Sequence, residues 1–111
     1  TAHDVAARLA VVPMVLEARG LDVTPAMLER VEAWGDSRGA KILSRILDDE
    51  IVHVRCGSTH FTAVADARGE SRENLWKSLV ARHFSGAIKP PFNDSARREA
   101  GLPRSFYAGV V

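Results

Sequence analysis

The amino-acid sequence predicts an all-α protein, and two observations carry this prediction. Apolar residues recur at spacings of three and four along most of the chain, and the breaks between these stretches hold residues that cap or end helices. No run of alternating polar and apolar residues indicates a strand. Because 111 residues suffice for one core and no long linker divides them, we expect a single domain over residues 1–111.

The first helix should run from about Asp4, a plausible N-cap, to Arg19, where Gly20 suits the C-terminal position. Pro13 should kink this helix, because proline leaves the carbonyl four residues earlier without its hydrogen-bond donor. Nearly all other positions are apolar, which is typical of a helix buried on several sides. The positions with regular helical spacing are Val5, Leu9, Val12 and Leu16.

A connection over residues 21–24 should lead to a second, shorter helix. Thr24 and Pro25 fit the N-cap and the first helical residue, because proline there lacks only a donor that would have no partner anyway. This second helix should end near Trp34, where a glycine follows.

A long third helix is expected over roughly residues 38–67, capped by Asp36 or Ser37 and ended by Arg68 and Gly69. Its apolar stripe, at spacings of three and four, should face the core. The residues of this stripe are Leu43, Ile46, Leu47, Val54, Gly57, Phe61 and Val64.

Two further helices complete the expected elements. Ser71 should cap a helix over about residues 72–84, which has an inward stripe of leucine, valine and tryptophan. After this helix the pattern dissolves, and glycines and prolines indicate an extended C-terminal arm. Within the arm, Asn93 should cap a short helix over roughly residues 94–100, which Gly101 ends.

Charge and composition exclude several classes of function. The net charge of +1 and the short basic pair Arg97-Arg98 do not indicate nucleic-acid binding. The longest apolar run, residues 9–16, is too short to span a bilayer. The single cysteine, Cys56, fits a reducing compartment and is expected to be a small buried side chain. We therefore expect a cytoplasmic protein with no nucleic-acid or membrane partner.

Glu50 and His53 stand three residues apart within the apolar stripe of the third helix, so their side chains should project on one face. A carboxylate on an apolar face is unfavourable unless something compensates its charge. A divalent metal ion would compensate it, with the imidazole as a neighbouring ligand. Glu17, on the almost uncharged first helix, is a second carboxylate of this kind. We therefore interpret Glu17, Glu50 and His53 as candidate metal ligands.

These residue types match half the ligand set of a di-iron or di-manganese bundle, which takes a glutamate from one helix and Glu-x-x-His from another. Carboxylates with imidazole suit iron or manganese. The motif is weak by itself, because Glu-x-x-His also arises by chance. The alternative is that His53 is a core histidine and that the carboxylates form ion pairs. Those pairs would join Glu50 to Arg45 or Arg55, and Glu17 to Arg8 or Arg19.

A resemblance to a known family rests on the order and the separation of four segments. They are residues 15–25 (VLEARGLDVTP), 46–54 (ILDDEIVHV), 90–93 (PPFN) and 95–101 (SARREAG). Together they resemble the bacterial ferritin-like family catalogued as domain of unknown function 455, over nearly the whole chain. The resemblance implies a ferritin-like helical bundle, of which this chain holds a helix pair, shorter helices and an extended arm.

The resemblance also implies a carboxylate-bridged dimetal centre. Glu17 would be the ligand of the third bundle helix, and Glu50 and His53 those of the fourth. Members of that family are longer, and their first half supplies the other glutamate and Glu-x-x-His. This chain has no second Glu-x-x-His, so one copy cannot complete the site. The chain is then either the C-terminal half of a longer family domain or one half of a dimeric bundle. We favour the homodimer, because closed two-fold pairs are the commonest assemblies.

One position departs from the family pattern. Relatives tend to carry a tryptophan where this chain has His60, two turns beyond His53 and near the same face. His60 is expected to be either an additional or outer ligand, or an ordinary imidazole with no such role.

The function that the resemblance implies is an oxygen-dependent dimetal oxidoreductase acting on an unidentified small molecule or modified nucleoside. Metal storage without turnover is one alternative, and a helical interaction module is another. The sequence therefore leaves open whether the chain is an enzyme.

Overall fold

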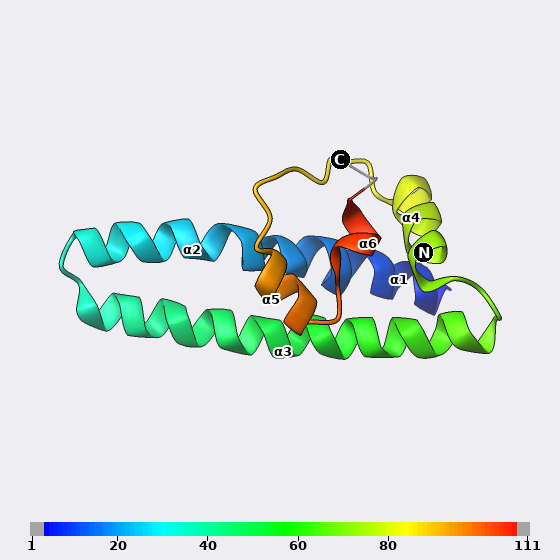
Figure 1. Ribbon diagram of the computed structural model, residues 1–111, viewed down its shortest axis with the longest axis horizontal. Helices are drawn as coiled ribbons and strands as arrows, with labels where there is room; N and C mark the ends of the chain where they lie inside the picture. The colour runs from blue at the N-terminus through cyan, green and yellow to red at the C-terminus, as the bar shows by residue number, and fades with distance from the viewer. Residues whose placement is uncertain (1–3, 109–111) are drawn as a thin grey trace.

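A computed structural model describes residues 4–108, which form helices and loops with no strand (Figure 1). Two long helical arms run antiparallel in a hairpin about 50 Å long. The first arm consists of α1 (Val5–Val11), a π-helical segment η1 (Val12–Glu17) and α2 (Ala18–Ala33), and the second is α3 (Ser37–Ala67). The all-α prediction is therefore confirmed.

Three shorter helices lie beside the hairpin: α4 (Arg72–His83), α5 (Asp94–Glu99) and α6 (Arg104–Tyr107). They gather over the half of the hairpin that contains α1, together with the extended segment between α4 and α5 (Figure 1). The expected fourth and fifth helices and the extended arm are thus present. The single turn of α6 was not expected from the sequence.

The helix ends follow the capping residues that the sequence indicates. The Asp4 carboxylate accepts a hydrogen bond from the Ala7 amide at 3.2 Å, and the Asp36 carboxylate accepts one from the Gly39 amide at 2.8 Å. Gly69 follows α3 with a φ of +68°, a conformation that glycine adopts without strain. Local chemistry therefore decides where these helices begin and end.

The connection expected before Pro25 is wrong, because α2 runs through this residue without a break. A proline inside a helix leaves the carbonyl four residues earlier without a donor, here that of Leu21. The Asn93 side-chain amide donates to the Leu21 carbonyl at 3.1 Å, and the Thr24 hydroxyl donates to Gly20 at 2.7 Å. A residue from the C-terminal arm thus supplies the hydrogen bond that proline removes.

The disturbance expected at Pro13 is present, but it takes the form of the π-helical segment η1. The Ala18 amide bonds to the carbonyl of Pro13, five residues earlier. The Pro13 ring packs on α3 at Gly57, where a Cβ atom would overlap with the ring. The missing side chain of Gly57 therefore allows the two arms to approach closely at this point.

The core lies between the two arms and the shorter helices, at the end of the hairpin that holds α1. Its largest fully buried side chains are Trp76, Tyr107, Phe61, Met14, Leu21, Leu102 and Val54. The first helix is not buried on several sides as expected. Alanines together with Met14 and Val15 form its buried face, and the side chains of Val5, Val12 and Leu16 are exposed.

Apolar side chains with no cover in this structure lie along both arms of the hairpin, including the end opposite α1. We call these residues the exposed apolar set: Val5, Val12, Leu16, Val23, Met27, Trp34, Ile42, Ile46 and Val52. Ile46 was expected to face the core and is exposed, as is Cys56, which was expected to be buried. Both expectations are wrong because α4, α5 and α6 leave these surfaces of α3 open.

Candidate metal centre

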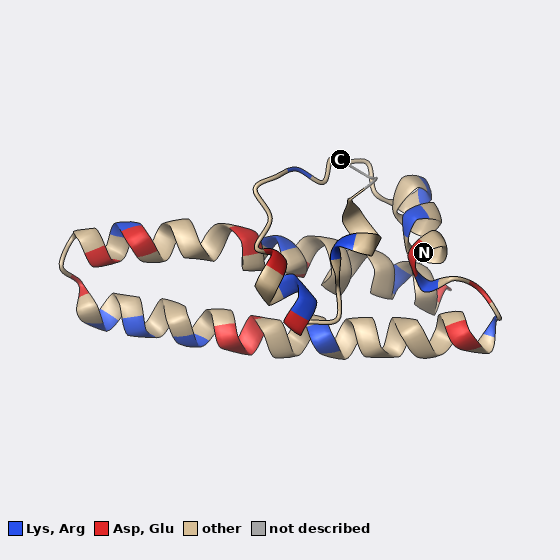
Figure 2. Cartoon of the chain, in the orientation of Figure 1, with Lys and Arg blue, Asp and Glu red and all other residues tan. Residues whose placement is uncertain are grey.

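The three candidate ligands lie on the facing arms of the hairpin, with Glu50 near both Glu17 and His53. Glu17 ends η1, and Glu50 and His53 lie on successive turns of α3. His53 Nδ1 is 3.7 Å from Glu50 Oε2, and a Cβ atom at Gly20 of α2 would lie 3.8 Å from Glu50 Cγ. Figure 2 shows an acidic band near the middle of α3. The fold therefore places Glu50 beside each of the other two candidate ligands.

Glu50 is held in surroundings that oppose its charge. Burial raises the pKa of its carboxyl, the neighbouring Glu17 raises it further, and His53 acts in the opposite direction. One oxygen, Glu50 Oε1, is buried and has no hydrogen-bond partner among the described residues. A buried carboxylate oxygen without a donor is unfavourable, so a positive group at this point would stabilise the charged form of Glu50.

The π-helical segment decides which way Glu17 faces. One extra residue in a turn changes the orientation of all that follows by about 100°, because an α-helix advances 3.6 residues per turn. Segments of this kind often occur at functional sites. Here the segment begins at Val12, is associated with Pro13 and ends at Glu17. The same local feature thus packs the helix on α3 and orients the first candidate ligand.

The alternative ion pairs do not form within residues 4–108. In the described chain, neither the Glu17 carboxylate nor the Glu50 carboxylate lies within ion-pair distance of an arginine. Arg55 instead donates to the carbonyl of Glu99 at 2.8 Å, and Arg19 donates to that of Lys89 at 2.8 Å. The interpretation of His53 as a core histidine is also disfavoured, because 64% of its side chain is exposed.

His60 lies two turns along α3 from His53, and its ring is engaged with its own helix. Its Nδ1 is 2.8 Å from the carbonyl oxygen of Cys56 and 3.7 Å from the sulfur of the same residue. No hydrogen bond or ion pair in the described chain joins His60 to Glu17 or Glu50. Its role as an additional or outer ligand stays a prediction.

The candidate ligands do not make a complete metal site by themselves. Over residues 4–108, no three side chains of histidine, cysteine, aspartate or glutamate are arranged to hold a metal ion. Glu17, Glu50 and His53 nevertheless supply the oxygen and nitrogen donors that iron or manganese takes, and Glu50 Oε1 is free to accept a cation. This donor set fits one part of a site that needs further ligands from outside the described chain.

Sequence reasoning missed a buried ion pair that joins α2, about one turn beyond Glu17, to α5. The side chains of Asp22 and Arg97 are 0% and 3% exposed, and two hydrogen bonds of 2.9 and 2.6 Å join them. The Asn93 backbone N–H also donates to the Asp22 carboxylate, at 2.9 Å. This paired geometry fixes the C-terminal arm to the turn of α2 that follows Glu17.

Two aromatic rings complete the surroundings of Arg97. The guanidinium carbon lies 5.0 Å from the ring centroid of Phe92 and 4.7 Å from that of Tyr107. The Tyr107 hydroxyl donates to Asp94, and burial raises the pKa of this hydroxyl to about 12. No pattern in the sequence marks this cluster, although Asp22 and Arg97 both fall in segments that carry the family resemblance.

Comparison with known proteins gives a family match and a related protein, but no solved structure. The model of a family described as protein of unknown function (DUF455) matches residues 1–108. An uncharacterized protein of Haemophilus influenzae is 40% identical over 102 residues. That match covers 92% of this chain but only 35% of the relative, so the chain spans about a third of that protein's length. No solved structure matches.

Within the described residues, no helix has both the length and the apolar character needed to cross a bilayer.

Proposed function

This chain belongs to the DUF455 family of proteins of unknown function, and from that premise we propose that it supplies half of a dimetal centre in a ferritin-like bundle. The observation that carries the proposal is the buried Glu50 Oε1, which has no hydrogen-bond partner in the described chain. It lies beside a second carboxylate, Glu17, and an imidazole, His53. A divalent cation would compensate both carboxylates at once.

Each of the three residues has a role in this proposal. Glu50, which is near both other residues, would hold the metal together with the second carboxylate of Glu17 and the imidazole of His53. The oxygen and nitrogen donors suit iron or manganese, which would supply redox chemistry when bound. The chain's own contribution is to hold two carboxylates close together through the packing of η1 on α3.

The other half of the centre comes from a second copy of the chain in this proposal. Val23, Met27 and Trp34 follow helical spacing along α2 and are exposed, and 76% of Trp34 is accessible. Apolar helical surface of this kind is typical of a face that packs on another helix pair. If the chain is part of a longer protein, other residues of that protein would pack on this face and supply the remaining ligands instead.

The activity that we propose is oxygen-dependent oxidation of a small molecule. Storage of metal without turnover is the second candidate, since the same ligands serve both. A cytoplasmic location is part of the proposal, because the one cysteine, Cys56, is free and fits a reducing compartment.

Metal uptake tests the ligand assignment. The chain is loaded anaerobically with Fe(II) or Mn(II), and metal per chain is measured after removal of the excess. We expect about one ion per chain, hence two per assembled pair. Glu17→Ala, Glu50→Ala and His53→Ala should each reduce this ratio strongly, and Glu70→Ala, at an exposed site in the α3–α4 turn, should not. Equal uptake by Glu50→Ala and Glu70→Ala would remove the basis of the proposal.

Oxygen consumption then separates the two candidate functions. Rapid consumption by the reduced, loaded chain, lost in Glu50→Ala, supports an oxidoreductase. Uptake of metal without repeated consumption supports storage. A chain that stays folded and paired but binds no metal contradicts both, and leaves a helical interaction module.

A further inference from the structure

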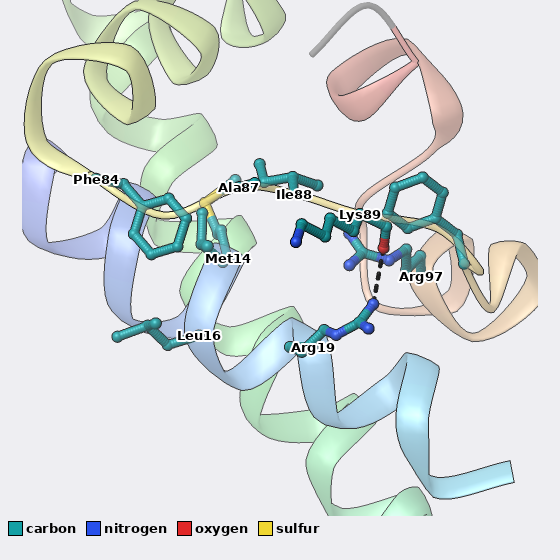
Figure 3. Close-up of a pocket in the computed structure, with 10 residues that line it drawn as sticks. Met14, Leu16, Arg19, Phe84, Ala87, Ile88, Lys89 and Arg97 are labelled. Carbon is teal, nitrogen blue, oxygen red and sulfur yellow. Dashed lines mark hydrogen bonds between the residues drawn. The ribbon is translucent and has the colours of Figure 1, made fainter. Parts of the chain in front are cut away.

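A cavity of about 210 Å³ lies between η1 and the extended segment that follows α4. Figure 3 shows Leu16 on the helix and Ala87 and Ile88 on the extended segment, with Phe84 beside Met14. Its walls are mainly apolar. The candidate metal ligands Glu17 and Glu50 are not among the residues that line it. The cavity is therefore a separate site from the candidate metal centre.

One end of the cavity carries positive charge. Lys89 extends its ammonium group between Ile88 and Arg19, over the cavity (Figure 3). Lys89 forms no ion pair within residues 4–108. Arg19 donates to the Lys89 carbonyl and lies 3.5 Å from Asp22, so one arginine and one lysine stand at the same end. Arg97, also in the wall, is already held by Asp22.

We propose that this cavity binds a small organic acid with a compact apolar body and one carboxylate. The apolar walls receive the body, and Lys89 and Arg19 bind the carboxylate. A cavity of about 150 Å³ accepts benzene, so one of about 210 Å³ has room for a single ring with a short acidic tail. A cationic ligand would meet two like charges and is excluded.

A ligand in the cavity would contact η1, the segment that carries the candidate metal ligand Glu17. Met14 and Leu16 belong to η1, the segment that ends at Glu17. The binding proposal does not depend on metal, because no candidate ligand lines the cavity. Failure of one proposal therefore leaves the other intact.

Nuclear magnetic resonance titration of the 111-residue chain with 3-phenylpropionate tests the inference, with 3-phenylpropanamide as the matched neutral probe. We expect saturable shifts at Met14, Phe84 and Ile88, and an affinity for the acid about tenfold above that for the amide, as for a charge-assisted hydrogen bond. Equal affinity for the two probes, or shifts that do not centre on these residues, would overturn the inference.

Two variants locate the binding groups. Lys89→Gln should remove most of the preference for the acid, whereas Lys41→Gln, on the distant part of α3, should preserve it. Ala87→Phe, at an exposed residue of the wall, should fill the cavity and abolish binding of both probes without changing the thermal midpoint. Undiminished binding by Ala87→Phe would place the ligand elsewhere and contradict the inference.

Discussion

At the scale of single residues, Glu50 combines features that rarely occur together. Its side chain is 25% exposed, yet one of its oxygens is buried with no hydrogen-bond donor in the described chain. The sequence predicts this residue as unusual, because a carboxylate interrupts an apolar stripe. Asp22 and Arg97 are equally unusual but unpredictable, since each looks like a solvated charge until the C-terminal arm folds back on α2.

The raised pKa of Glu50 makes the stability of the metal-free chain depend on pH. The folded chain keeps the proton to a higher pH than the unfolded chain, whose glutamates ionise near pH 4.5. The stability contributed by the neutral carboxyl is therefore complete below pH 4.5 and is lost as the pH rises through the folded-state pKa. Glu50→Gln should raise the thermal midpoint at pH 7 and should have little effect at low pH.

The control for this prediction is Asp49→Asn, which removes a charge from the exposed neighbouring position. Thermal unfolding of both variants, followed by circular dichroism from pH 3 to pH 8 in the presence of a chelator, measures the effect. A pH-independent difference between Glu50→Gln and the parent chain would show that burial of this charge is not the cause.

The buried pair of Asp22 and Arg97 predicts a large loss of stability when one partner is removed. Arg97→Met should lower the free energy of unfolding by about 3–5 kcal/mol, because it leaves a buried carboxylate without its cation. Arg98→Met removes the adjacent, exposed arginine and should change it by less than about 0.5 kcal/mol. Urea unfolding compares the two, and similar values would mean that Arg97 does not hold the arm in place.

At the scale of helices, the sequence predicts local events better than distant ones. The caps at Asp36, Ser71 and Asn93 act within a single turn, and the structure confirms them. The break expected before Pro25 is wrong because its compensating donor comes from Asn93, far along the chain. The π-helical segment at Pro13 was likewise not predictable in this form, since its packing partner Gly57 lies on another helix.

The contact between Pro13 and Gly57 gives a prediction at this scale. Gly57→Ala should destabilise the chain by about 1–3 kcal/mol, because the added methyl group overlaps with the proline ring. Gly20→Ala is the matched control in the other arm, where the new Cβ would make only an ordinary contact. That variant should be neutral or stabilising by up to about 1 kcal/mol, as alanine favours helices. Urea unfolding decides the comparison, and equal effects would contradict the close approach.

At the scale of the whole molecule, the hairpin is covered unevenly. The shorter helices and the arm pack over one half, and the other half leaves much of the exposed apolar set in solvent (Figure 1). The sequence predicts the apolar pattern but not which residues the chain itself would cover, because that depends on where the arm returns. In our proposal, a second copy of the chain covers this open half and supplies the remaining ligands.

Self-association tests this link. Ile46→Glu should weaken pairing of the chain about tenfold or more, since burying one large aliphatic side chain is worth about 1.5–3 kcal/mol. Ser44→Glu places the same charge at an exposed polar position of α3 and should have little effect. Sedimentation velocity over a range of concentrations measures both. A chain that is monomeric throughout, or pairing that Ile46→Glu leaves unchanged, would contradict the homodimer.

The central claim is that Glu17, Glu50 and His53 bind metal, and anomalous X-ray diffraction from crystals grown with Mn(II) tests it most directly. We predict a pair of manganese peaks between facing helix pairs, with all three side chains within bonding distance of one or the other ion. Ordered Glu17, Glu50 and His53 with no peak beside them, in crystals that bind manganese elsewhere or not at all, would contradict the account.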